Sequence, residues 1–307
     1  MKPSLKSRLI NCLFRNRHLF RGKLYKGTFD MNTSIQEFRD LCERGASRFG
    51  RLPAGIKVKP EVIEGINCEW LVPAGSDTSK LIFYVHGGGY VSGSCSDHRN
   101  IVSKFAVKTG ITCLVFEYRL APEHPFPAGL EDTVTLYRRI VSSGYAPGHI
   151  LIAGESAGGG LCLAILLALK ERGIPLPVAG LAISPWTDLT CSGDSYHTKN
   201  KKSVAPLNSW FVFSKLYAGE HDPSDPLISP LFGDLKGLPP LFIDAGEDDE
   251  LFDDARLFAE KAKTAGVDVT FRPGPKQVHC YPLMAPMFPE ATHALEEIVG
   301  FVRGKFG

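Results

Sequence analysis

The sequence predicts an α/β fold in which helices flank a mostly parallel central sheet. From about residue 57, short β-rich apolar runs alternate with helical segments, and this alternation is typical of parallel sheets covered on both faces. A continuous apolar run such as residues 81–85 also suits a strand that is buried on both sides. Strands are expected at residues 58–63, 68–72, 81–85, 111–116, 149–153, 178–184, 240–245 and 267–272, and helices at 97–108, 130–141, 157–170, 253–265 and 290–305.

Two stretches of the chain fall outside this alternation. One runs from the N-terminus to about residue 50, and the other covers roughly residues 190–235 and is rich in polar residues, proline and aromatics. Neither resembles an independent domain. Both are candidates to lie over the carboxyl edge of the sheet, where open α/β sheets bind their ligands.

The composition is that of an ordinary globular chain. Of 307 residues, 44% are apolar and 22% are charged, which excludes a disordered or collagen-like protein. No apolar run approaches the roughly 20 residues that span a bilayer. The formal charge of +2 does not favour a nucleic-acid partner. The charges are, however, unevenly distributed along the chain. Residues 1–29 carry eight Lys or Arg and no acid, which leaves 27 basic and 33 acidic residues, a charge of −6, in the rest.

The basic N-terminal segment also contains an apolar stripe. Leu5, Leu9 and Leu13 recur every four residues, with Ile10 and Phe14 beside them, as on one side of a helix. The favoured interpretation is a cap helix that is docked on the body of the protein, with its basic face outward. A helix that contacts a membrane surface or a partner is the alternative.

Eight cysteines are present, and none of them forms a CxxC pair, so no zinc or other metal site is predicted. Cys113 and Cys162 lie inside apolar runs and are expected to be small core residues. The N-terminus lacks the continuous apolar stretch of a signal peptide. We therefore expect reduced thiols and a cytoplasmic location.

A nucleophile elbow is the strongest chemical signal. Residues 151–160 place G-x-S-x-G between an apolar strand and an apolar helix, the context that such an elbow requires. Gly154 and Gly158 must be small because the turn is tight, and Ser156 then presents its hydroxyl at a helix N-terminus, which favours negative charge. A glycine-rich turn without chemical use is the alternative.

The sequence HGGGY at residues 86–90 directly follows an expected strand. Successive glycines let the backbone approach a substrate and direct N–H groups at it, and in serine hydrolases this motif binds the oxyanion. We expect the N–H groups of Gly88 and Gly89 to be donors, together with that of Ala157. His86 is expected to stabilise the loop and not to act as a base. A phosphate-binding role for this glycine motif is disfavoured, because it lacks the Lys and Ser/Thr of a P-loop.

A serine nucleophile needs a base and an acid, which follow it in the order acid, then histidine. Of the three histidines beyond residue 200, His221 lies in the polar stretch and His293 lies on an expected surface helix. His279 follows a strand and a loop and is therefore the expected base. The acid should come from residues 247–250, a run of four carboxylates, most of which we expect to lie in a solvated loop or at a helix N-terminus. Spacing alone does not choose among them.

Together these motifs resemble the bacterial hormone-sensitive-lipase-like esterases of family IV, which have the α/β-hydrolase fold with a helical cap. The resemblance covers roughly residues 55–305 and rests on motifs in the expected order. The motifs are HGGGY at 86–90, YRLAPEHPFPA at 118–128, GESAGG at 154–159, SPW at 184–186, SPL at 229–231 and Asp253-Asp254. In this family the acid opens the pattern D/E-x-L-x-D-D/E, a frame that selects Asp249. The chain departs from the family at Glu155, where Asp is commoner, and a carboxylate is kept.

The resemblance implies a carboxylic-ester hydrolase. Ser156 would attack the ester carbonyl of a small molecule, His279 would take its proton, and Asp249 would hold the histidine, with no metal or organic cofactor. It also implies an N-terminal cap segment at residues 1–50 and a hydrolase domain at 51–307 with a cap insertion around 190–225. An acyl pocket for short to medium chains is expected from Tyr90, Trp186, Leu207, Trp210 and Phe211. A second copy of the chain, in a homodimer, is a further candidate partner.

Two other functions fit the same motifs. An amidase or formamidase would use the same triad, since its chemistry differs mainly in the protonation of the leaving group. A non-catalytic receptor on this scaffold is the second alternative, because the plant gibberellin receptors resemble the family but lack the triad histidine. His279 is present in this chain and argues against a receptor.

Overall fold

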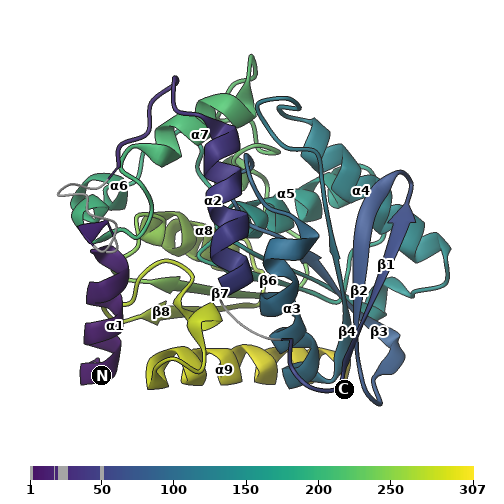
Figure 1. Ribbon diagram of the computed structural model, residues 1–307. Coiled ribbons are helices and arrows are strands. Elements are labelled where there is room, and N and C mark those ends of the chain that lie inside the picture. The colour runs from purple at the N-terminus through teal and green to yellow at the C-terminus, as the bar shows by residue number, and fades with distance from the viewer. Residues whose placement is uncertain (1–2, 17, 20–26, 49–51) are drawn as a thin grey trace.

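A central sheet lies between two layers of helices in the computed structural model, which describes residues 3–16, 18–19, 27–48 and 52–307 (Figure 1). In the described residues the sheet has eight strands in the order β1-β2-β4-β3-β5-β6-β7-β8. The strands are β1 Ile56–Ile63, β2 Ile66–Pro73, β3 Asp77–Val85, β4 Ile111–Phe116, β5 Ile150–Glu155, β6 Ala179–Ile183, β7 Leu241–Gly246 and β8 Val269–Gly274. Every expected strand is present to within a few residues.

The sheet is mostly parallel, as predicted. β1 and β2 form an antiparallel hairpin, and β2 pairs antiparallel with β4. From β4 to β8 all neighbouring strands are parallel. The carboxyl ends of β3, β5, β6, β7 and β8 therefore open onto one edge, so the loops that follow them can meet there.

Two apolar cores fill the space between the sheet and its helices. α3 and α9 cover one face, and α4, α5 and α8 cover the other. The helices are α1 Leu5–Arg15, α2 Ile35–Arg48, α3 Cys95–Thr109, α4 Ala128–Ser142, α5 Ala157–Glu171, α6 Ser195–Thr198, α7 Ser209–Ala218, α8 Phe252–Thr264 and α9 Pro289–Phe306. The five helices predicted between and after the strands are all confirmed.

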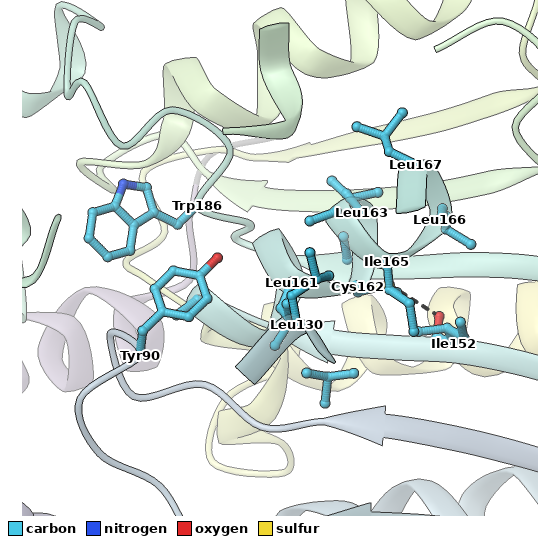
Figure 2. Packing of buried hydrophobic residues seen from close by; sticks show 14 of the residues in the cluster. Tyr90, Leu130, Ile152, Leu161, Cys162, Leu163, Ile165, Leu166, Leu167 and Trp186 are labelled. Carbon is cyan, nitrogen blue, oxygen red and sulfur yellow. Dashed lines mark hydrogen bonds between the residues drawn. The ribbon is translucent and has the colours of Figure 1, made fainter. Parts of the chain in front are cut away.

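Helix α5 is apolar all round because it is covered on every side. Every residue from Ala157 to Leu169 is buried. Figure 2 shows its side chains packed against the strand behind them, with Cys162 Sγ 3.4 Å from the carbonyl oxygen of Ile152. Cys162 and Cys113 are both fully buried, which confirms that they are core residues.

The two segments outside the alternation pack on each other. Thr28 forms a parallel bridge with Leu207, and the Asn208 side chain donates to the carbonyl oxygen of Phe29 at 2.9 Å. The ring of Phe29 also lies edge-on to that of Phe213 on α7, with centroids 5.2 Å apart. The N-terminal segment and the insertion thus form one layer, although they are about 180 residues apart in sequence.

Helix α1 is docked on the body of the protein as expected, but through the opposite face. Ser7 and Asn11 are buried, and both donate to Gln277 Oε1 at 3.1 Å. Leu5, Leu9 and Leu13 point to solvent, with exposed fractions of 80%, 62% and 45%. The prediction that the leucine stripe is the docking face is wrong, because the docked side carries Ser7 and Asn11 and, of the apolar residues, the partly buried Ile10. No helix in the described part of the chain is long and apolar enough to cross a membrane.

The packing of α5 leads to a stability prediction. Leu163→Ala should lower the free energy of unfolding by about 2–5 kcal/mol, because the residue is fully buried and its removal leaves a cavity. Leu257→Ala on α8 is the matched control, since Leu257 is 36% exposed and should cost less than about 1 kcal/mol. Urea denaturation of both variants measures the difference. Equal losses would contradict the buried position of α5.

Candidate active site

Ser156 lies at the turn between β5 and α5. Its backbone has φ +57° and ψ −125°, a strained conformation for a residue with a side chain. A Cβ on Gly154 would lie 2.3 Å from the carbonyl oxygen of Gly158, and a Cβ on Gly158 would lie 2.2 Å from that of Val85. The positions two residues before and two residues after the serine must therefore be glycine. Ser156 is 8% exposed and stands at the start of α5.

His279 and Asp249 meet from two different loops. Asp249 follows β7, His279 follows β8, and His279 Nδ1 lies 2.7 Å from Asp249 Oδ2. A neutral imidazole that donates from Nδ1 keeps Nε2 as a proton acceptor. The loop of the histidine is held from β6, where Ser184 Oγ accepts the N–H of Cys280 at 3.1 Å.

The pKa of His279 is set by two opposing effects. Burial acts to lower this pKa, but the adjacent carboxylate of Asp249 outweighs burial and holds the pKa well above its ordinary value. The ring is also in edge contact with Trp210, with centroids 5.5 Å apart. This histidine therefore gains a proton at a higher pH than an exposed histidine does.

The other two candidate histidines lie elsewhere. The side chain of His293 on α9 is 64% exposed. His221 is exposed and lies edge-on to Phe126, with ring centroids 5.0 Å apart. Neither has a carboxylate partner in the loops after β7 and β8 among the described residues.

The acidic run is mostly buried. Asp248, Asp249 and Glu250 are each at most 6% exposed, so the run is not a solvated loop; it directly precedes α8, which begins at Phe252. Asp248 binds Arg15 of α1 at 2.7 Å and Lys202 of the insertion at 2.8 Å. Burial raises the pKa of Asp248, but the two cations outweigh burial and lower it overall. This carboxylate joins the two segments that cover the edge of the sheet.

Glu250 supports the aromatic wall of the site. It accepts a hydrogen bond from Trp210 Nε1 at 2.8 Å, and burial raises its pKa. Asp254, further along the same frame, accepts the N–H groups of Thr187 and Asp188 at 2.8 Å each. The carboxylates of the family pattern therefore hold the loop after β6 and the side chains around the histidine.

The glycine loop after β3 presents free donors. Among the described residues, the N–H groups of Gly88, Gly89 and Ala157 have no acceptor. Gly88 and Gly89 have φ of +118° and +66°, and a Cβ on Gly89 would lie 2.4 Å from the ring of Phe213. Only glycine fits this close approach. Donors of this kind, beside the start of a helix, suit an oxyanion.

A buried ionic network supports this loop. Glu155 Oε1 accepts the N–H of Gly87 at 2.6 Å and lies 2.8 Å from His98 Nε2. The other ring nitrogen of His98 is paired with Asp97. Burial acts to lower the pKa of His98, but Glu155 and Asp97 outweigh it and raise the pKa well above the ordinary value. Asp97 and His98 were not predicted from the sequence as part of the site, because they lie 57 or more positions from Glu155.

His86 contacts the glycine loop and an aromatic ring, as expected for a residue that stabilises this loop. Its Nδ1 lies 2.8 Å from the carbonyl oxygen of Gly87, and its ring stacks on Tyr118 with centroids 4.3 Å apart. Burial lowers the pKa of His86 to about 4, so the ring is neutral at pH 7. A neutral ring is compatible with the imidazolium of His98, whose ring centroid is 5.2 Å away.

The five expected pocket residues occupy different positions. Trp210 contacts the ring of His279, and it is in edge contact with Trp186 at 5.1 Å. Tyr90 and Trp186 are buried beside each other near the start of α5 (Figure 2). Leu207 is half-buried, and its backbone pairs with the N-terminal segment. Phe211 is 36% exposed, and its ring contacts are with Tyr196 and His197, away from His279.

Other aromatic residues near the glycine loop were not predicted from the sequence as pocket residues. Phe213 lies over Gly89, and its ring contacts Phe29 and Phe38 at 5.2 and 5.3 Å. A cavity of about 330 Å³ lies beyond this cluster and is lined by Phe29, Phe38 and residues 204–206. Ser156 and His279 do not line it. Phe213 therefore stands between this cavity and the glycine loop. Among the described residues, no cluster of three His, Cys, Asp or Glu could hold a metal ion.

Known proteins share this architecture over nearly the whole chain. The profile of a protein family described as alpha/beta hydrolase fold matches residues 82–283. An acetyl-hydrolase of Streptomyces hygroscopicus is 38% identical over 90% of this chain and 92% of its own length. An esterase of Acinetobacter venetianus is 31% identical over 93% of this chain and 95% of its own.

Solved structures agree with the sequence relatives. An esterase from the bacterial hormone-sensitive lipase family has a TM-score of 0.90 and 36% identity, with both chains covered completely. A mutant of the esterase E40 has a TM-score of 0.90 and 37% identity over 99% of this chain and 100% of its own. The chain belongs to the α/β-hydrolase family, and within it to the bacterial hormone-sensitive-lipase-like carboxylesterases that its motifs resemble. The predicted fold and family are confirmed.

The buried pair of His98 and Glu155 gives a pH prediction. Folding raises the pKa of His98, so its contribution to stability is complete below about pH 6.5 and declines as the pH rises towards the raised value. His98→Gln should cost about 3 kcal/mol at pH 6, because it leaves a buried carboxylate without its cation. The difference between wild type and variant should shrink by pH 9. Denaturation at both pH values measures it.

His293→Gln is the control for this comparison. Its side chain is 64% exposed, so the free energy of unfolding should change by less than about 0.5 kcal/mol at either pH. A His98→Gln loss that grows with pH would contradict a protonated His98.

Proposed function

We propose that Ser156, His279 and Asp249 form the catalytic triad of this carboxylesterase. The observation that carries the proposal is the 2.7 Å contact between His279 Nδ1 and Asp249 Oδ2. With Nδ1 so engaged, Nε2 of the neutral ring is the atom that accepts a proton. The strained turn at Ser156 supports its role as the nucleophile.

In this mechanism Ser156 Oγ attacks the ester carbonyl carbon while its proton passes to His279 Nε2. The carbonyl oxygen becomes an oxyanion, which accepts hydrogen bonds from the N–H groups of Gly88, Gly89 and Ala157. His279 then protonates the leaving alcohol, and an acyl-enzyme remains on Ser156. A water molecule, deprotonated by His279, attacks this acyl group and releases the carboxylic acid and the free serine.

We propose further that residues 1–50 and the insertion around 190–225 act as the cap over this site. Support comes from the contacts of Phe29, Phe38 and Phe213 above the glycine loop, and from Arg15 and Lys202, which share Asp248. Such close aromatic walls favour short to medium acyl chains. The likeness to an acetyl-hydrolase supports the same size range.

Two alternatives rest on the same residues. An amidase would need only that His279 protonate an amine instead of an alcohol. A receptor would not need the hydrogen bond between His279 and Asp249, so its presence supports an enzyme. The cytoplasmic location and a homodimer stay predictions of the sequence analysis.

Asp249 can be tested as the acid of the triad by replacing its carboxylate. Asp249→Asn should lower kcat by about 10⁴, the loss known for this change in chymotrypsin, because the amide can hold the wrong tautomer of His279. In the wild type, the fall of kcat/KM on the acid side should lie above pH 6.5, because Asp249 raises the pKa of His279. In the variant this fall should move to lower pH. Turnover of a p-nitrophenyl ester from pH 5 to 9 measures both effects.

Asp248→Asn is the matched control. Asp248 is also buried, but its partners are Arg15 and Lys202, so we expect less than about a tenfold loss of kcat. The thermal stability of both variants should be followed in parallel, because Asp248 joins two segments of the cap. If Asp248→Asn abolishes turnover and Asp249→Asn does not, the acid has been misassigned.

The length of the acyl chain that the enzyme accepts can be tested with a series of esters. Among p-nitrophenyl esters of increasing acyl length, kcat/KM should be highest for short to medium chains and should fall steeply for long ones. The matching p-nitroanilides should be turned over far more slowly, since an esterase does not need to protonate a poor amine leaving group. Strong activity on emulsified long-chain triglycerides would contradict the confined pocket, and faster turnover of the anilides would favour the amidase.

A further inference from the structure

An exposed leucine stripe runs along α1 at the edge of the molecule. Leu5, Leu9 and Leu13 are 80%, 62% and 45% exposed, whereas Ile10 of the same helix is partly buried against the core. Figure 1 shows α1 at the margin, beside β8 and α9, with only one side towards the body. Single exposed leucines are common, but three in a row on one helix mark an interaction surface.

The helix does not need this stripe for its own docking. Ser7 and Asn11 bind Gln277, Ser4 caps the helix and is paired with Glu290, and Arg15 binds Asp248. All these contacts lie on the polar side. The leucines are thus held in a fixed direction, away from the protein.

Basic residues border the stripe on both sides. At 100° per residue, Lys6 and Arg8 fall on opposite flanks of the leucines, and both are exposed. Lys276 lies at the docked face of the helix, since its carbonyl oxygen accepts from Asn11, and its side chain is exposed. Lys202 shares Asp248 with the end of α1. A central apolar band between cations is the pattern of helices that lie in a membrane interface.

Three carboxylates lie near the helix, and one of them is paired with cations. Asp248 binds Arg15 and Lys202, whereas Glu290 and Glu247 accept hydrogen bonds from neutral groups of Ser4 and Lys276 and keep their charge. Residues 1–29 contain eight Lys or Arg and no acid, whereas the rest of the chain has a charge of −6. An anionic surface would attract this end of the molecule and repel the remainder, which fixes the orientation.

We propose that α1 docks this esterase on the surface of an anionic lipid bilayer. Leu5, Leu9 and Leu13 enter the boundary between headgroups and acyl chains, while Lys6 and Arg8 bind lipid phosphates. Because Arg15 at the end of α1 binds Asp248, the residue before Asp249, docking holds the site close to the bilayer. This proposal does not depend on the catalytic assignment.

Vesicle binding of the full chain tests the proposal. The wild type should sediment with phosphatidylcholine vesicles that contain about 30% phosphatidylserine, and more weakly with pure phosphatidylcholine. A triple variant with Leu5→Gln, Leu9→Gln and Leu13→Gln should bind at least about tenfold more weakly. Lys6→Gln and Arg8→Gln should each cost about fivefold on the anionic vesicles only, and high salt should have the same effect.

A control variant with Val62→Gln, Val107→Gln and Leu257→Gln removes three exposed apolar side chains that lie far apart, and it should bind as the wild type does. Unchanged turnover of a soluble short-chain ester shows that the variants are folded. The proposal is overturned if the wild type does not bind anionic vesicles or if the leucine variant binds as tightly. If the wild type is a dimer that does not bind vesicles, and the leucine variant is a monomer, the stripe instead contacts a second copy of the chain.

Discussion

The turn at Ser156 is the constraint on which the rest of the site depends. Its left-handed backbone costs of the order of 1–3 kcal/mol and persists only where the surroundings impose it. Those surroundings are close: the N–H of Ser156 donates to Ile183 on β6, and its carbonyl oxygen accepts the N–H of Trp186. On the other side, Gly158 touches the backbone at the end of β3. Three strands and the helix α5 therefore have to be in place before the serine can be presented.

Buried carboxylates, more than secondary structure, organise the loops around this turn. Glu155 holds the glycine loop, Asp254 holds the loop after β6, and Asp249 holds the histidine. Each of them is bound by backbone N–H groups or by a histidine, which lowers the cost of burying a charge, although Glu155 is bound through Oε1 alone among the described residues. Loops fixed in this way keep their N–H groups directed at the place where negative charge develops during ester hydrolysis, so the solvent need not reorganise.

The layer above the site is assembled from distant parts of the chain. α1 and α7 share no strand with the core sheet, and they are joined to it by Asp248 and by the aromatic contacts of Phe213. This separation lets the layer vary without disturbing the strained turn. It also leaves the apolar side of α1 free for a surface outside the protein, while its polar side stays tied to the hydrolase domain.

The strands, the helices, the elbow at Ser156 and the family could be predicted from the sequence, because these depend on local patterns of apolar residues and glycines. His279 was singled out by its place in a loop after an expected strand, whereas Asp249 was selected only through the family pattern. Only the tertiary structure decided that Asp97 and His98 complete the support of Glu155, that Asp248 is buried, and that the leucines of α1 face outward. Helical periodicity shows which residues share a side of a helix, but not which side is docked. That choice rests on partners such as Gln277, which lies more than 260 residues away and is brought near only by folding.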